Sequence, residues 1–261
     1  MTIEIANELI TLSIDPTAGG RLSSLRIAGR ERLVVDRLRG PIGWGCYVMA
    51  PWAGRIRNGE FTFAGTSHHM PCDLPPHAIH GTTYDAIWSV EDVTASSILV
   101  SCTLGTTWPF AGNVRHEIAL DHDTIHLTLD LHAHESMPAQ VGWHPWFAKP
   151  AHVEHSFRAM YVRGADGIPT GELVEPTRGP HDDCFIDALT TPRVVFDDGL
   201  SLELRSDCDH WVVYDEQPHG LCVEPQSGPP NGINDAPTLV SAHTSLRRTF
   251  DLTCVGYPQI G

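Results

Sequence analysis

Two short segments of the sequence carry residue types that could move protons. His144 lies within Gly142–Phe147 and Glu224 within Cys222–Gln226, and a proline follows each of them. An imidazole titrates near pH ~6.5 and a free glutamate near ~4.3, so the two side chains could donate and accept a proton at neutral pH. Because proline fixes its own backbone and restricts the residue before it, each side chain is expected at a set angle. The sequence thus predicts one general acid and one general base.

The sixteen histidines raise the question of a metal site, and the densest group is His126, His132 and His134 beside Glu135. If the apolar residues of segment 125–131 face the core, these histidines lie on the opposite, polar face of one strand. The group also lacks the wider spacing with which a carboxylate from another turn or strand closes a metal shell. We therefore predict a solvated strand face here and no metal site.

Composition and motifs argue against several classes of function. The chain has 17 lysines and arginines against 32 aspartates and glutamates, a formal charge of -15, which repels nucleic acids and anionic lipid surfaces. The sequence contains no Gly-x-Ser-x-Gly segment, no phosphate-binding glycine loop and no glycine fingerprint after a strand, so common hydrolases and nucleotide-binding proteins lose support. We expect neither nucleic acid nor membrane as a partner.

The N-terminus and the cysteines bear on the compartment. The first residues show no basic segment followed by an apolar run and a cleavage site, and no stretch approaches a membrane-spanning length. The seven cysteines are scattered, odd in number and contain no Cys-x-x-Cys, which favours reduced thiols over a disulfide framework. A cytoplasmic location is therefore expected.

The elements that must position the acid and the base are predicted to be strands. Short apolar runs alternate with polar residues, and Gly, Pro and Asp interrupt them at short intervals, which is typical of an all-β chain. Asp197-Asp198-Gly199 lies between two apolar runs and predicts a hairpin. Further strands are predicted at 3–14 and 21–35, which would pair, at 116–120 and 125–131, which would also pair, and at 97–104, 211–214 and 249–255.

Two longer irregular stretches, 71–83 and 165–183, are rich in Pro, Gly and His, and loops of that length usually carry function. The sequence shows no internal repeat and no linker-like change of composition, so residues 1–261 are expected to form a single domain. A chain of this size can bury roughly 70 to 75% of its unfolded surface. So many evenly spread strands favour two large antiparallel sheets packed face to face.

Five segments with functional potential follow one another along the chain. They are Gly54–Phe61, His77–Gly81, Gly142–Phe147, Asp182–Phe185 and Glu224–Asn231. In order and residue type they resemble the aldose 1-epimerases, the galactose mutarotase family, over nearly the whole chain. The resemblance implies a large antiparallel β-sandwich with an open sugar-binding cleft, and catalysis without a metal or an organic cofactor. A monomer or a homodimer is expected.

The resemblance also assigns roles, one residue at a time. It implies that Glu224 is the catalytic base and His144 the catalytic acid. Arg55 matches a sugar-binding arginine and His80 a substrate-binding histidine. Asp182 matches a carboxylate that binds sugar hydroxyls.

The sequence departs from the family pattern at two positions. Gly54 stands where the galactose enzymes typically have Asn, and Thr82 where they have a second Gly, which leaves the preferred sugar open. Asp183 adjoins Asp182, and in an extended segment only one of the two can reach the cleft. Arg57 competes with Arg55, although the spacing to the following glycine and phenylalanine favours Arg55.

Trp44, Trp52, Trp143 and Trp146 could stack on a sugar face or fill the core, and the sequence does not separate these cases. The expected reaction is the interconversion of the α and β anomers of a free aldohexose through ring opening. Two alternatives stay open: a hexose-phosphate mutarotase, which would need extra basic residues around the phosphate, and a carbohydrate-binding or sensing domain without catalysis.

Overall fold

The structure, a computed structural model, describes residues 2–256. Seventeen of its strands belong to one continuous sheet, and the pairs between them are antiparallel. The all-β antiparallel class predicted from the sequence is therefore confirmed. No helix within these residues is long and apolar enough to cross a membrane.

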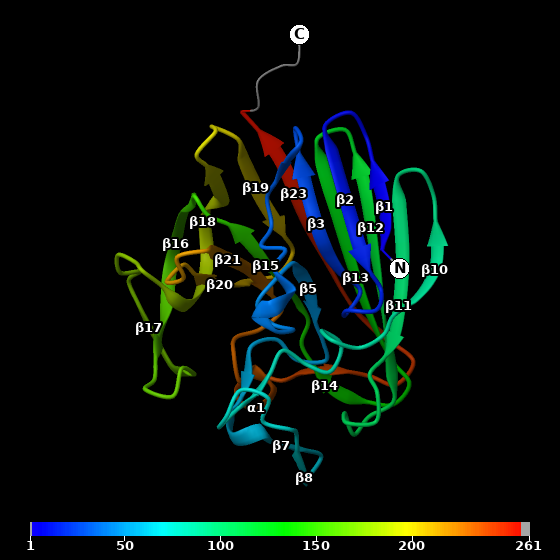
Figure 1. Ribbon diagram of the computed structural model, residues 1–261. Coiled ribbons are helices and arrows are strands. Elements are labelled where there is room, and N and C mark those ends of the chain that lie inside the picture. The colour runs from blue at the N-terminus through cyan, green and yellow to red at the C-terminus, as the bar shows by residue number, and fades with distance from the viewer. Residues whose placement is uncertain (1, 257–261) are drawn as a thin grey trace.

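One arm of the sheet leads from the N-terminus to the strands that carry the predicted acid and base (Figure 1). Read from the strand pairs, its order is β1, β2, β3, β5, β15, β21 and β20. The bounds are β1 Ile3–Ala6, β2 Ile10–Asp15, β3 Arg21–Ile27, β5 Cys46–Met49, β15 Gly142–Ala148, β21 Gly220–Gln226 and β20 His210–Tyr214.

The other arm runs in the order β10, β11, β12, β13, β23 and β19. Strand β18 joins the two arms, because its first residues pair with β20 and its last residues pair with β19. Strands β16 and β17 continue outward from β18. The bounds are β10 Ser89–Val93, β11 Ser97–Thr103, β12 Gly112–Asp121, β13 Thr124–Ala133, β23 Ser245–Val255, β19 Ser201–Ser206, β18 Asp182–Phe196, β16 Ala151–Arg163 and β17 Pro169–Val174.

Short elements fill the connections, and α1, β7 and β8 lie together at one end of the molecule (Figure 1). Three pairs stand apart from the large sheet: β6 with β9, β7 with β8, and β14 with β22. The bounds are β4 Arg30–Glu31, β6 Arg55–Ile56, β7 Glu60–Phe63, β8 Thr66–His69, β9 Ala78–Ile79, β14 Met137–Ala139, β22 Thr238–Val240, the helix α1 Gly232–Asp235, and the 3-10 turns η1 Arg37–Arg39 and η2 Arg57–Gly59.

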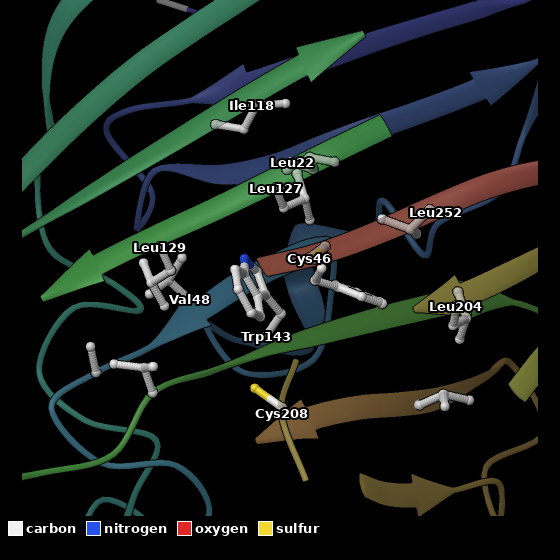
Figure 2. Packing of buried hydrophobic residues seen from close by; sticks show 14 of the residues in the cluster. Leu22, Cys46, Val48, Ile118, Leu127, Leu129, Trp143, Leu204, Cys208 and Leu252 are labelled. Atoms are coloured by element: carbon white, nitrogen blue, oxygen red, sulfur yellow. The ribbon is translucent and has the colours of Figure 1, made fainter. Parts of the chain in front are cut away.

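Apolar side chains from both arms meet in one core, which makes the sheet a sandwich. Figure 2 shows Trp143 of β15 among Leu22 of β3, Val48 of β5 and Leu127 of β13. The buried indole Nε1 of Trp143 donates a hydrogen bond of 3.1 Å to Nε2 of His116 on β12. This bond links the layer that carries the predicted acid to the opposite layer, and it satisfies two polar atoms that water does not reach.

Alternation of apolar and polar residues decides which face of each strand is buried. Ile125 and the leucines 127, 129 and 131 of β13 are fully buried, and the residues between them are not. His126 on the outer face contacts Asp251 of β23, and the outer-face residues His132 and His134 have polar partners as well. The prediction of a polar strand face for this histidine group is confirmed.

Several strand predictions hold and two need correction. The pairing of 116–120 with 125–131 and the hairpin around 197–199 are present. Residues 3–14 do not form one strand, because the side chain of Asn7 accepts hydrogen bonds from the two amides at 9 and 10 and turns β1 back onto β2. The strand predicted over 21–35 ends at residue 27, where two residues with positive φ form a turn. All seven cysteines are free thiols.

Candidate active site

The five residues predicted to act in the site line one cleft of about 340 Å³. Each comes from a different part of the chain: Arg55 from β6, His80 from just after β9, His144 from β15, Asp182 from the start of β18 and Glu224 from β21. The two long irregular segments predicted to carry function both reach it, through Leu74, Ile79 and His80 of the first and Asp182 of the second. The residues that line the cleft are Ile42, Gly43, Gly54, Arg55, Leu74, Ile79, His80, His144, Trp146, Asp182, Val212, Tyr214, Glu224, Gln226 and Pro230.

The predicted acid and base face each other across two neighbouring strands. In the register of β15 with β21, Gly142 pairs with Gln226 and Trp146 with Cys222, which places His144 opposite Glu224. Nε2 of His144 lies 3.2 Å from Oε1 of Glu224, and the two side chains are only 7% and 4% exposed. Two residues 80 positions apart in the sequence therefore form a direct contact at the wall of the cleft.

Aromatic rings hold the imidazole of His144 in place. Tyr47, its partner on β5, stacks on it with 4.7 Å between ring centroids. Trp146 stacks at 5.6 Å, and the ring of His80 meets it edge-on at 4.9 Å. Because these rings surround the imidazole, it can exchange a proton without changing its position.

Burial shifts the two members of the pair in opposite directions, because low-dielectric surroundings disfavour either charged form. It lowers the pKa of His144 to about 3. It raises the pKa of Glu224 well above its usual range, and the negative charge of Asp182 adds to this. Both shifts therefore favour the neutral forms, a protonated Glu224 beside a neutral His144.

His80 reaches the cleft from a strained turn. Its φ is +60°, and its amide donates to the carbonyl of Gly54 at 2.9 Å. Gly81 follows with φ +85°, and a Cβ there would overlap the carbonyl group of Ala50, so only glycine fits. Burial, with the nearby His144, lowers the pKa of His80 well below its usual value. A neutral imidazole therefore lines the cleft here.

Arg55 and Asp182 lie next to each other on the cleft wall. Arg55 donates to the carbonyl of Gly167 at 3.0 Å, and its Nη2 lies 3.9 Å from Oδ2 of Asp182. Burial raises the pKa of Asp182 although two arginines oppose the shift. Arg163 is the second of them, 2.8 Å from the same carboxylate oxygen. The carboxylate is thus fixed from two sides, with part of it left toward the cleft.

The structure resolves two alternatives that the sequence left open. Asp182 lines the cleft, whereas Asp183 turns away from it and contacts His181 at 3.2 Å. Arg55 lines the cleft, whereas Arg57 is half-exposed and pairs with Asp166.

Polar contacts between loops fix the position of Arg55, and no motif in the sequence pointed to them. Asn231, at the end of the proline-rich turn after β21, donates its amide to the carbonyl of Arg55. Its side chain accepts the amide of Arg57 at 3.0 Å. His77 is buried, accepts the amide of Asn58 at 3.1 Å and contacts the carbonyl of Asp166 at 3.0 Å. The turn that follows Glu224 and the segment that carries Arg55 are therefore tied into one unit.

The unusual glycine before Arg55 has a structural reason. Gly54 has φ +64°, and a Cβ at this position would lie 2.9 Å from the side chain of Pro230. A larger residue here would have to displace the turn that follows Glu224. The close packing of Gly54 against Pro230 therefore explains why glycine stands at this position.

Three of the four candidate tryptophans are core residues. Trp44, Trp52 and Trp143 are buried and do not line the cleft. Trp146 does line it, but its ring stacks with His144 and also with His219 at 5.5 Å. Its main contacts therefore support the imidazole.

One group within residues 2–256 has the geometry to hold a metal ion: the ligand atoms of His144, Cys222 and Glu224 all lie within 4.8 Å of one another. The sulfur would have to bind as a thiolate. Burial raises the pKa of the Cys222 thiol well above its usual range, which opposes that form. Burial thus favours the neutral thiol of Cys222, which is a poor metal ligand.

Comparisons with known proteins agree with this fold. Among solved structures, a galactose mutarotase-like protein from Clostridium acetobutylicum superposes with a TM-score of 0.87 at 17% identity, over 98% of this chain and 95% of that chain. Galactose 1-epimerase from Lactobacillus acidophilus gives 0.83 at 15% identity, over 98% and 95%. These two show a shared fold.

Sequence comparison adds a relative and a family. The uncharacterized protein YihR of Escherichia coli K12 is 23% identical over 86% of this chain and 83% of its own length. Residues 1–246 match the family model of the aldose 1-epimerases. With its fold and with a match over nearly its whole length, the chain belongs to the aldose 1-epimerase family.

Proposed function

We propose that the protein interconverts the α and β anomers of a free aldohexose, with Glu224 as general base and His144 as general acid. The observation that carries the proposal is the 3.2 Å contact between the carboxylate of Glu224 and the imidazole of His144 at the wall of a sugar-sized cleft. The family match and the galactose-specific name of the Lactobacillus acidophilus neighbour support a sugar as the substrate.

The chemistry needs one proton removed and one delivered. Glu224 takes the proton of the anomeric hydroxyl, and protonated His144 gives one to the ring oxygen as the bond between C1 and that oxygen breaks. Rotation about the C1–C2 bond of the open-chain aldehyde presents the other face of the carbonyl. Ring closure then reverses both transfers. The pair holds one proton before and after each step, so the buried site never gains a net charge from the reaction.

The opposite pKa shifts of the two groups serve this reaction. A raised pKa makes the Glu224 carboxylate a stronger base, and a lowered pKa makes the His144 imidazolium a stronger acid. Burial makes the charged arrangement of the pair the less stable one, and the hydroxyls of a bound sugar can form hydrogen bonds with the charged groups. Each well-placed group contributes typically ~10²- to 10⁴-fold to the rate.

Arg55, His80 and Asp182 are proposed to bind the sugar hydroxyls. Arg55 is a donor, Asp182 an acceptor when ionised, and neutral His80 can act as either. Hydroxyls of a pyranose both donate and accept, and those away from C1 and the ring oxygen persist in the open chain. These contacts therefore hold the sugar through ring opening and limit its escape as the aldehyde.

The arginines near the cleft argue for a free sugar over a sugar phosphate. Arg55 and Arg163 both lie within 4 Å of the carboxylate of Asp182, and Arg57 pairs with Asp166. A phosphate group would have to break these pairs to gain a counter-charge. We expect hexose 6-phosphates to react more slowly than the free hexoses when both are compared at equal concentration in a polarimeter.

Polarimetry on fresh α-D-glucose or α-D-galactose, with the spontaneous rate subtracted, tests the proposal. Glu224→Gln and His144→Gln should each remove most of the excess rate while circular dichroism shows a folded protein. His126→Gln, on the outer face of β13, is the matched control and should keep the wild-type rate. Sugar binding by calorimetry together with no excess rate in the wild type would instead favour a binding domain without catalysis.

A further inference from the structure

A glutamine in the cleft contacts the proposed base and has no role in the proposal so far. Gln226 lies two residues after Glu224 on β21, so both side chains project from the same face of the strand. Gln226 is fully buried and lines the cleft. Its neighbour across the strand pair is Gly142, where a Cβ would lie 3.2 Å from the Cα of Gln226.

The amide nitrogen of Gln226 is bonded to the carboxylate of Glu224. Nε2 donates to Oε2 at 3.1 Å, while the other oxygen, Oε1, faces Nε2 of His144 at 3.2 Å. The two oxygens of Glu224 therefore have separate partners, one on each side. A donor fixed on Oε2 sets the rotation of the carboxyl group and keeps Oε1 directed at the imidazole and the cleft.

The oxygen of the same amide has no hydrogen-bond partner among the described residues. Oε1 of Gln226 is buried and accepts no hydrogen bond from any residue between 2 and 256. A buried amide oxygen without a donor is costly, and this one belongs to a side chain on the cleft wall. A sugar hydroxyl can supply the missing donor. Because Gln226 lies beside Glu224 on one strand face, that hydroxyl would be one next to the anomeric centre.

We infer that Gln226 is a positioning residue: through Nε2 it holds the reacting carboxylate of Glu224, and through Oε1 it accepts a hydrogen bond from a hydroxyl of the bound sugar. The inference rests on the proposed role of Glu224. It adds a residue through which substrate binding and the orientation of the base are coupled. The hydrogen bond from Gln226 also favours the ionised form of Glu224, against the effect of burial.

The test is Gln226→Met, which keeps the length of the side chain and removes both the donor and the acceptor. We expect kcat/KM for anomerisation to fall about 10- to 100-fold, the range for loss of a hydrogen bond to a charged group. We expect kcat to fall because the carboxylate of Glu224 is no longer held in place, and KM to rise because the contact with the sugar hydroxyl is lost. Loss of kcat with an unchanged KM would overturn the substrate contact.

A pH profile separates positioning from a general loss of structure. Glu224 holds the proton of the pair, so the fall in kcat/KM at alkaline pH reports its deprotonation. Without the donor from Gln226 the carboxylate is less stable, and the alkaline limb should move to higher pH. Gln140→Met is the matched control: Gln140 is also a buried glutamine with one amide contact, to the carbonyl of Pro229, and an unpaired oxygen. It should leave that limb at its wild-type position.

A double-variant comparison distinguishes failure of this inference from failure of the proposed function. In a Glu224→Gln background, adding Gln226→Met should not lower kcat further, because the carboxylate that Gln226 positions is already absent. A full additional loss of kcat, or a wild-type alkaline limb in Gln226→Met, would overturn the inference. Near-wild-type activity of Glu224→Gln alone would instead overturn the proposed function.

Discussion

Replacing Glu224, the proposed base, should make the protein more stable, and increasingly so as the pH rises. In the folded protein, burial raises the pKa of Glu224 above the usual 4.5, so Glu224 keeps its proton while the unfolded chain releases it. A group whose folded pKa is raised binds more protons in the folded state, and the free energy of unfolding then falls as pH rises above the unfolded pKa. Gln mimics the protonated carboxyl group, can donate to neutral His144, and does not titrate.

The size of the effect follows from the difference of one bound proton. The free energy of unfolding of Glu224→Gln minus that of the wild type should increase by up to about 1.4 kcal/mol per pH unit above pH ~5, until the folded wild type also ionises. The shift of His144 acts separately: its pKa is lowered to about 3, so both proteins lose stability as pH falls below the usual 6.5. In the wild type the two effects give maximal stability between these two unfolded values.

Urea unfolding followed by tryptophan fluorescence at pH 5, 6, 7 and 8 would measure this difference. The control is Glu117→Gln, which replaces an exposed glutamate on β12. Its free energy of unfolding should change with pH in the same way as that of the wild type. Parallel pH dependence of Glu224→Gln and the wild type would show that Glu224 titrates normally in the folded state. The one-proton account of the pair would then be wrong.

Three further results are expected. Trp143→Phe removes the bond between the layers and leaves Nε2 of His116 buried without a partner, so urea unfolding should show a loss of about 1–3 kcal/mol. Asp182→Asn should raise KM for the free sugar while Asp183→Asn leaves it within about twofold, because Asp182 alone of the two lines the cleft; equal effects would contradict the assignment. Activity should fall on both sides of a plateau, since the pair works with one proton, and a rate that rises steadily with pH after subtraction of the spontaneous reaction would be inconsistent with it.

Local patterns in the sequence were enough to predict most of the sheet. The alternation of β13 placed its histidines on the outer face, and the turn residues 197–199 predicted a hairpin that is present. The break at Asn7 was missed because the apolar alternation continues through it, while a side-chain hydrogen bond turns the backbone. The continuity of the two arms through β18 has no local signal either, since it depends on which strands pair at long range.

The candidate site residues could be selected from the sequence where residue type alone indicates chemistry. His144 and Glu224 were selected because a proline follows each, and the resemblance to a family supplied Arg55, His80 and Asp182; all five line one cleft. Gln226 and Tyr47 lacked such a signal. Their importance comes from strand register, which places Tyr47 opposite His144 and leaves Gln226 beside Glu224. Register is fixed by the packed sheet as a whole, and no segment of the sequence contains it.

The central claim is that His144 and Glu224 act together on one hemiacetal, and exchange between the anomers of glucose at equilibrium, followed by NMR saturation transfer, tests it most directly. His144→Gln and Glu224→Gln should each lower the catalysed exchange rate by about 10²- to 10⁴-fold, and the double variant should lose little more, because groups that act as a unit are not additive. Single variants that keep most of the rate, or losses that multiply in the double variant, would contradict the claim.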